Sequence, residues 1–230
     1  MVAGAEFDSL VVEAELTPSK ITEIFERRRE SAKLDYKLLV DPSSRRDAVE
    51  LTKDVVAMAN SAGGYILVGV RDDSTEVGIP DELLARIDET TIRAQTGSYL
   101  ATAVDLFVNK AVKRDGRRFA ILTILRSRQS PLVFARDGQY TDGNRTVAVF
   151  RQGDVFVRHG SASERWNQDD VRTLYSRVVE REKERWLSGV LPDVRRLIEA
   201  AGKGETHAPN PTELLLADAE SFEKRLRGRK

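Results

Sequence analysis

The chain contains no cysteine, which excludes disulfide bonds, thiol catalysis and cysteine-based zinc sites. It has only two histidines among 230 residues, so neither a histidine-rich metal site nor a Ser-His-Asp hydrolase is expected. No run of about eighteen apolar residues occurs, and the first residues lack the pattern of a signal peptide. We therefore expect a cytoplasmic protein.

An excess of charge of one sign is also missing, because 37 lysines and arginines balance 37 aspartates and glutamates. The distribution of charge is more informative than its sum. Residues 110–158 carry eleven cations against four carboxylates, and such a segment can form a surface patch that contacts phosphates. Alternatively, these cations lie on a solvated sheet and are balanced by acids on neighbouring elements.

With 40% hydrophobic and 32% charged residues, the chain has the composition of one globular domain with extensions. Its organising stretch is residues 48–80. Apolar residues at steps of three and four predict a helix over 48–60, capped by Ser44. Gly63-Gly64 ends this helix, and the apolar run 65–70 predicts a central strand that stops at the acidic turn Asp72-Asp73.

The flanking residues predict further elements. Residues 20–30 and 80–100 read as helices, and residues 34–40 as a strand on which Asp35 and Lys37 project to the same side. Further strands are expected at 104–108, 119–125, 131–134, 146–150 and 155–158. A charged helix over 167–189, a break at Pro192, a short helix over 194–201, a linker over 207–211 and a basic tail over 223–230 complete the chain.

Four ordered segments resemble the Schlafen AlbA-like (AlbA_2) domain family. Residues 29–37, RESAKLDYK, resemble its opening Glu-Ser-x-x-x-Glu-Phe-Lys, with Asp35 in place of the second glutamate. Residues 56–64, VAMANSAGG, are similar to its Ala-Phe-Ala-Asn-x-x-Gly-Gly segment. Residues 69–73, GVRDD, are similar to its Gly-Val-x-Asp segment, and residues 157–161, VRHGS, to its Arg-x-Gly-Ser element.

This resemblance implies an α+β fold with a mixed sheet packed by helices and a C-terminal helical extension. The domains expected are an N-terminal arm over 1–24, the Schlafen AlbA_2-like domain over 25–166, the helical extension over 167–205, and a linker with basic tail over 206–230. Because this chain carries one signature where Schlafen cores resemble two related lobes, a homodimer is a further hypothesis. Its contact would be the helix over 171–179 together with Trp186.

The resemblance also implies a function in nucleic-acid binding. Some relatives are endoribonucleases in which three carboxylates bind a divalent cation, and the matching positions here are Glu30, Asp35 and either Asp72 or Asp73. Mg²⁺ or Mn²⁺ held there could activate water, and Lys37 could stabilise charge on the phosphate. On this interpretation, the protein is a metal-dependent endoribonuclease that acts on structured RNA such as tRNA.

The alternative is a non-catalytic DNA-binding regulator or assembly module. In either case we expect the nucleic acid, RNA or DNA, to be contacted by cations of the basic segment and its end: Lys110, Lys113, Arg114, Arg117, Arg118, Arg126, Arg128 and Arg158.

Overall fold

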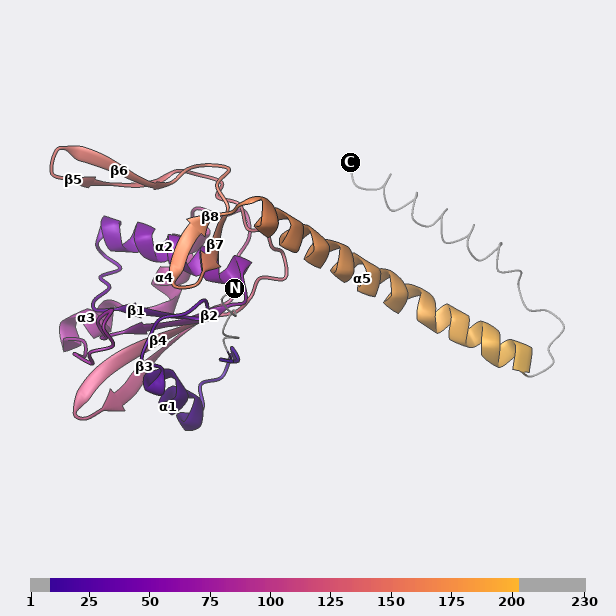
Figure 1. The fold of residues 1–230 in the computed structure, drawn as a ribbon, viewed down its shortest axis with the longest axis horizontal. Helices are drawn as coiled ribbons and strands as arrows, with labels where there is room; N and C mark the ends of the chain where they lie inside the picture. Colours follow the sequence, from indigo (N-terminus) through magenta and orange to yellow (C-terminus); the bar gives the residue numbers. More distant parts are fainter. Residues whose placement is uncertain (1–8, 203–230) are drawn as a thin grey trace, which may run out of the picture. The chain divides into compact units, whose positions relative to one another are not determined.

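A four-stranded mixed sheet forms the centre of the fold. Its strands are β1 (Leu34–Lys37), β2 (Gly64–Val68), β3 (Leu106–Arg114) and β4 (Arg117–Ile124), in the spatial order β1-β2-β4-β3. β1 runs parallel to β2, whereas β2 with β4 and β4 with β3 are antiparallel pairs. Together with the helices on both of its faces (Figure 1), this sheet makes the fold α+β, as the sequence predicts.

The computed structural model describes residues 9–202. The chain divides into two compact units, Met1–Leu174 and Tyr175–Lys230. The sheet and all the candidate site residues belong to the first unit. The predicted linker and basic tail over 206–230 lie outside the described residues.

β2 is buried along its whole length, which confirms the predicted central strand. Successive side chains of a strand point to opposite faces. Accordingly, Ile66 and Val68 belong to one hydrophobic cluster, whereas Tyr65 and Leu67 belong to another. The near-continuous apolar run in the sequence thus reflects a strand that is covered on both sides.

The helix α2 (Arg45–Asn60) supplies the first of these covers. Ser44 is its N-cap, as predicted, and the Ser44 hydroxyl accepts a hydrogen bond from the amide of Asp47 at 3.3 Å. The chain leaves the helix through Gly63, whose φ is +75°. A Cβ at this position would lie 2.6 Å from the carbonyl oxygen of Ile124, so only glycine fits.

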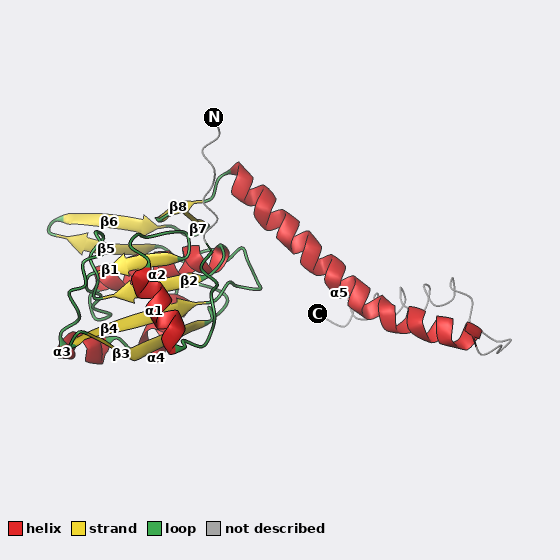
Figure 2. Cartoon of the chain, turned by 60° about the horizontal axis from the view of Figure 1, so that its bottom comes forward, coloured by secondary structure: helices red, strands yellow, loops and turns green. Residues whose placement is uncertain are grey.

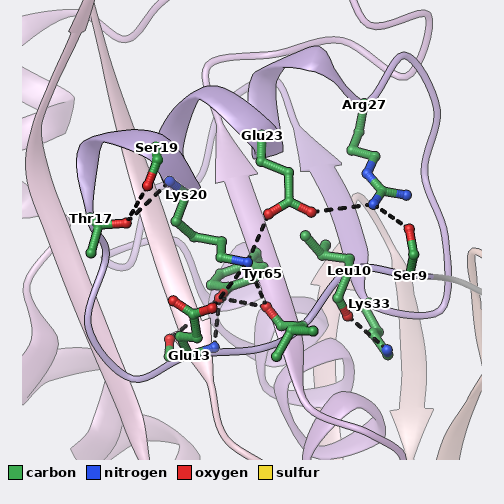
Figure 3. Close-up of polar contacts among 11 residues, drawn as sticks. Ser9, Leu10, Glu13, Thr17, Ser19, Lys20, Glu23, Arg27, Lys33 and Tyr65 are labelled. Carbon is green, nitrogen blue, oxygen red and sulfur yellow. Dashed lines mark hydrogen bonds and ion pairs between the residues drawn. The ribbon is translucent and has the colours of Figure 1, made fainter.

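The helix α1 (Pro18–Glu26) and the segment before it cover the opposite face, and Figure 3 shows the polar contacts between them. Lys20 Nζ lies 2.7 Å from Glu23 Oε2 and 3.2 Å from Glu13 Oε1. The Tyr65 hydroxyl accepts a hydrogen bond from the amide of Glu13 at 2.7 Å. The residues before α1 are thereby tied to the central strand.

α1 ends earlier than predicted. Its last residue is Glu26, so Glu30 lies beyond the helix and not at its end. The chain then turns tightly, with the amide of Ser31 donating to the carbonyl oxygen of Leu34 at 2.8 Å. This turn brings Glu30 and Asp35 onto separate elements of the chain, the loop after α1 and β1.

The helix predicted over 80–100 is two helices, α3 (Asp81–Arg86) and α4 (Glu89–Gly97). Asp88 separates them because its carboxylate accepts a hydrogen bond from the amide of Thr91 at 2.9 Å and thus caps a new helix.

Two hairpins follow the sheet, β5 (Gly138–Asp142) with β6 (Arg145–Phe150), and β7 (Phe156–His159) with β8 (Ala162–Arg165). Figure 2 shows them as ribbons separate from the four-stranded sheet. The sequence predicts β6 and β7 but neither partner strand. The strand predicted over 131–134 is wrong, because there only Phe134 forms a single bridge, to Leu100.

The last described element is α5 (Gln168–Gly202). The predicted break at Pro192 is wrong, because the helix continues through that proline. A proline removes one hydrogen bond from a helix, and the helix-forming residues on both sides maintain it here. None of the helices in the described part of the chain has the length and apolar character needed to cross a membrane.

Candidate functional site

A polar pocket of about 450 Å³ lies where β1, α2 and the β7–β8 hairpin meet. Its lining is dominated by charge. The carboxylates are Glu30, Asp35, Asp47, Glu50, Asp54 and Asp72, and the cations are Lys37, Arg46, Lys53 and Arg158. Four of the five residues predicted to be catalytic therefore line one pocket: Glu30, Asp35, Lys37 and Asp72.

Asp35 is the innermost of the predicted acids, with only 3% of its surface exposed. It lies on β1, two residues before Lys37, so the two side chains share a face of the sheet. Lys37 Nζ is 2.9 Å from Asp35 Oδ2. The contact is an ion pair, since within the described part of the chain that oxygen has no well-aligned hydrogen-bond donor.

Arg158 on β7 contacts the other carboxylate oxygen of Asp35, although 123 positions separate the two residues in sequence. Its Nη2 donates to Asp35 Oδ1 at 3.1 Å and to the carbonyl oxygen of Ser31 at 3.2 Å. Its Nη1 donates to the Ser163 hydroxyl at 3.2 Å. Asp35 is thus held between two cations.

Asp54 on α2 is a further buried carboxylate, 4% exposed, and the sequence did not single it out. Lys37 Nζ lies 2.8 Å from Asp54 Oδ2, so one ammonium group contacts two carboxylates. Burial opposes the charge on Asp54, but Lys37 and then Lys53 outweigh it and hold the pKa of Asp54 below its ordinary value. Burial likewise opposes the charge on Lys37, but Asp54 and Asp35 raise the pKa of Lys37 above its ordinary value.

Glu30 lies at the edge of this group. Its Oε1 accepts a hydrogen bond from the amide of Tyr36 at 2.9 Å, which fixes the turn between the two elements. Burial raises the pKa of Glu30, and the neighbouring charge of Asp35 raises it further, while the amide of Tyr36 opposes both.

The acidic turn after β2 supplies Asp72 to the pocket, whereas Asp73 does not line it. Asp73 Oδ1 instead accepts a hydrogen bond from the amide of Thr75 at 2.9 Å, a contact within the turn itself. Both residues are exposed. The geometry thus favours Asp72 over Asp73 as the third acid of the sequence interpretation.

The expected metal site can be compared with this arrangement. A divalent cation needs carboxylate oxygens that are free to converge on it. Here Asp35 is already paired with Arg158 and Lys37. Within residues 9–202, no group of three or more His, Asp and Glu side chains is arranged to hold a metal ion. The three carboxylates line one pocket, but in this arrangement they do not fit a shared cation.

The asparagine of the segment VAMANSAGG hydrogen-bonds to backbone groups far away in the sequence. Asn60 is fully buried, and its Nδ2 donates to the carbonyl oxygens of Leu132 at 3.1 Å and Phe156 at 2.9 Å. Its Oδ1 accepts from the amide of Leu132 at 2.6 Å. The neighbouring Ser61 hydroxyl accepts from the amide of Arg158 at 2.8 Å. This segment therefore holds β7, and with it Arg158, against α2.

The predicted nucleic-acid contacts are divided between two places. Lys110 and Lys113 on β3, Arg117 and Arg118 on β4, and Arg126 and Arg128 in the following loop are exposed. Part of the positive charge is balanced by ion pairs. Arg114 Nε lies 3.2 Å from Glu76 Oε2, and Arg118 Nη1 lies 3.3 Å from Asp81 Oδ1.

Arg158 differs from the other predicted contacts. Only 1% of its side chain is exposed, and its charge is paired with Asp35. Its position therefore corrects the expectation that it lies on the phosphate-binding surface.

Asp54 is the main residue that sequence reasoning missed. It lies opposite the apolar stripe of α2, where a charged residue is normally solvated. The β7–β8 hairpin covers this side of the helix. One signal was available: residues 55–59 are apolar all round, which is typical of a helix buried on both sides.

Comparison with known proteins gives one family and a distant structural similarity. No curated protein matches the chain. Among solved structures, the DIP2311 protein from Corynebacterium diphtheriae is similar over 57% of this chain and 30% of its own, with 16% identity and a TM-score of 0.37.

The Schlafen AlbA_2 family matches residues 30–167, more than half of the chain. The match begins at Glu30 and contains all four segments whose resemblance was noted from the sequence, apart from Arg29. The chain belongs to the Schlafen AlbA_2 family, which indicates a function related to nucleic acid.

Proposed function

We propose that residues 30–167 form a nucleic-acid-binding module that contacts phosphates through the β3–β4 hairpin. The family match carries this proposal, and the exposed cations of the hairpin support its location. Lys110 and Lys113 are exposed on β3, an edge strand of the sheet. The polar pocket is a poorer surface for phosphates because its carboxylates outnumber its cations.

The test is a binding titration at several salt concentrations with structured RNA, single-stranded RNA and duplex DNA. The variant Lys110→Glu/Lys113→Glu should weaken binding. Each lost phosphate contact should reduce the slope of log K against log salt by about 0.9 for duplex DNA and about 0.7 for single strands. The matched control, Lys183→Glu/Arg185→Glu, makes the same charge change at exposed positions of α5 and should bind like the wild type. Equal weakening by both variants would refute a specific hairpin surface.

Metal-dependent cleavage of structured RNA such as tRNA stays a second prediction. One observation favours it, namely that Glu30, Asp35 and Asp72 line the same pocket. The pairing of Asp35 with two cations weighs against it. Incubating the same RNA panel with and without Mn²⁺ separates the two functions: cleavage that Glu30→Gln and Asp72→Asn both abolish would make the protein a nuclease.

The homodimer also stays a prediction. It is supported by large apolar side chains of α5 that are exposed, including Val171 at 42%, Tyr175 at 70% and Trp186 at 71%. Light scattering at high micromolar concentration tests it, and a monomeric mass there would exclude this dimer.

A further inference from the structure

The ammonium group of Lys37 lies between two buried carboxylates that come from different elements. It is 2.9 Å from Asp35 Oδ2 on β1 and 2.8 Å from Asp54 Oδ2 on α2. Both aspartates are almost fully buried, whereas 31% of the Lys37 side chain is exposed. The lysine therefore reaches the pair of carboxylates from the open side of the pocket.

The four charges in closest contact cancel, with Lys53 further off at 3.7 Å from Asp54 Oδ1. Asp35 and Asp54 are the two anions, and Lys37 and Arg158 are the two cations. A divalent cation added to this balanced group would leave excess positive charge in a poorly solvated place, which is unfavourable. Without Lys37, Asp35 would keep Arg158, and Asp54 would keep only Lys53, whose Nζ is 3.7 Å from Asp54 Oδ1. The loss of one positive charge between the two carboxylates would favour a bound cation there.

We propose that Lys37 is the resident cation of this pocket: its ammonium group occupies the position between Asp35 and Asp54 that a divalent ion would otherwise take. Carboxylate oxygens are the ligands that Mg²⁺ and Mn²⁺ prefer, and here two of them converge on one nitrogen. Lys37 thus takes the place of a metal ion between these two carboxylates, and its removal converts Asp35 and Asp54 into a divalent-cation site. This inference concerns the pocket alone and does not rest on nucleic-acid binding.

The test measures Mn²⁺ binding by calorimetry and by electron paramagnetic resonance, together with the thermal midpoint with and without Mn²⁺. The variant Lys37→Ala should bind Mn²⁺ at least about tenfold more tightly than the wild type, and its thermal midpoint should rise with Mn²⁺. The control Lys53→Ala removes the neighbouring lysine, whose Nζ is 3.7 Å from Asp54 Oδ1, and should show neither change.

A second variant locates the effect. Lys37→Ala/Asp54→Asn lacks one of the two carboxylates and should lose the gained affinity. Persistence of the gain in this double variant would overturn the proposal, because the metal would then bind elsewhere. A folded Lys37→Ala without any gain would also overturn it.

Loss of folding in Lys37→Ala is informative as well, because two carboxylates would then repel one another without their cation. If Mn²⁺ restores the folded state of this variant and Mg²⁺ does so at higher concentration, the proposal is supported. If neither ion restores folding, Lys37 acts as a structural ion-pair partner and the proposal fails. None of these measurements uses nucleic acid, so their failure is distinct from failure of the proposed function.

Discussion

Replacing Arg158 by methionine tests the buried charge group directly. The guanidinium donates three hydrogen bonds, to Asp35, to the Ser31 carbonyl oxygen and to Ser163, from a side chain that is 1% exposed. Removal of one partner of a buried ion pair costs about 3–5 kcal/mol, because the other charge is left without compensation. Asp35 retains Lys37, so we expect the lower end: Arg158→Met should reduce the free energy of unfolding by about 3 kcal/mol.

Urea unfolding near pH 7 measures this loss from the midpoint and the slope. A double-mutant cycle with Asp35→Asn should give a coupling energy of about 1–3 kcal/mol, since the two residues are in contact. The control Arg165→Met removes a guanidinium that is 58% exposed and paired with Asp154, and should change stability by less than about 0.5 kcal/mol. A loss below about 1 kcal/mol for Arg158→Met, at unchanged slope, would refute the argument.

Three further predictions concern stability. Val68→Asp should abolish cooperative unfolding, because an unpaired carboxylate would be buried in the central strand, and near-ultraviolet circular dichroism with a thermal melt checks it. Asn60→Ala should lower the free energy of unfolding in urea by about 2–4 kcal/mol, because two carbonyl oxygens and one amide lose their buried hydrogen-bond partner. Hydrogen bonds to Asp170 and then to Glu164 raise the pKa of His159 in the folded protein. Protonated His159 therefore contributes its full stabilisation below its unfolded pKa of about 6.5. This stabilisation is lost as the pH rises through the higher folded pKa. The wild type should therefore lose stability relative to His159→Gln as the pH rises above about 6.5, and parallel curves would contradict this.

The centre of the fold was predictable because local and tertiary preferences agree there. The cap Ser44, the glycine turn at Gly63 and the apolar run of β2 each specify one conformation. β5 was missed because GQYTD has no apolar alternation and is a strand only through its pairing with β6. The break assigned to Pro192 was wrong because one proline does not outweigh the helical preference of its neighbours.

The site was predictable only in part. The segment RESAKLDYK places Glu30, Asp35 and Lys37 within eight residues, so their proximity follows from one turn and one strand. The partners that determine their chemistry come from elsewhere: Asp54 from α2 and Arg158 from β7. Neither residue has a local pattern that indicates ion pairing, because the pairing depends on the β7–β8 hairpin covering the charged side of α2.

The distribution of charge around the pocket determines where a polyanion can approach. Asp35, Asp54, Lys37 and Arg158 cancel one another in its interior. The remaining lining carries four carboxylates and two cations, so the rim is acidic and repels a phosphate backbone. A nucleic acid bound by the exposed cations of the hairpin would therefore keep its phosphates away from the pocket. Reversal of Arg46 at the rim should then leave the salt dependence of binding unchanged, whereas reversal of Lys110 and Lys113 should reduce it; the opposite result would place the phosphates in the pocket.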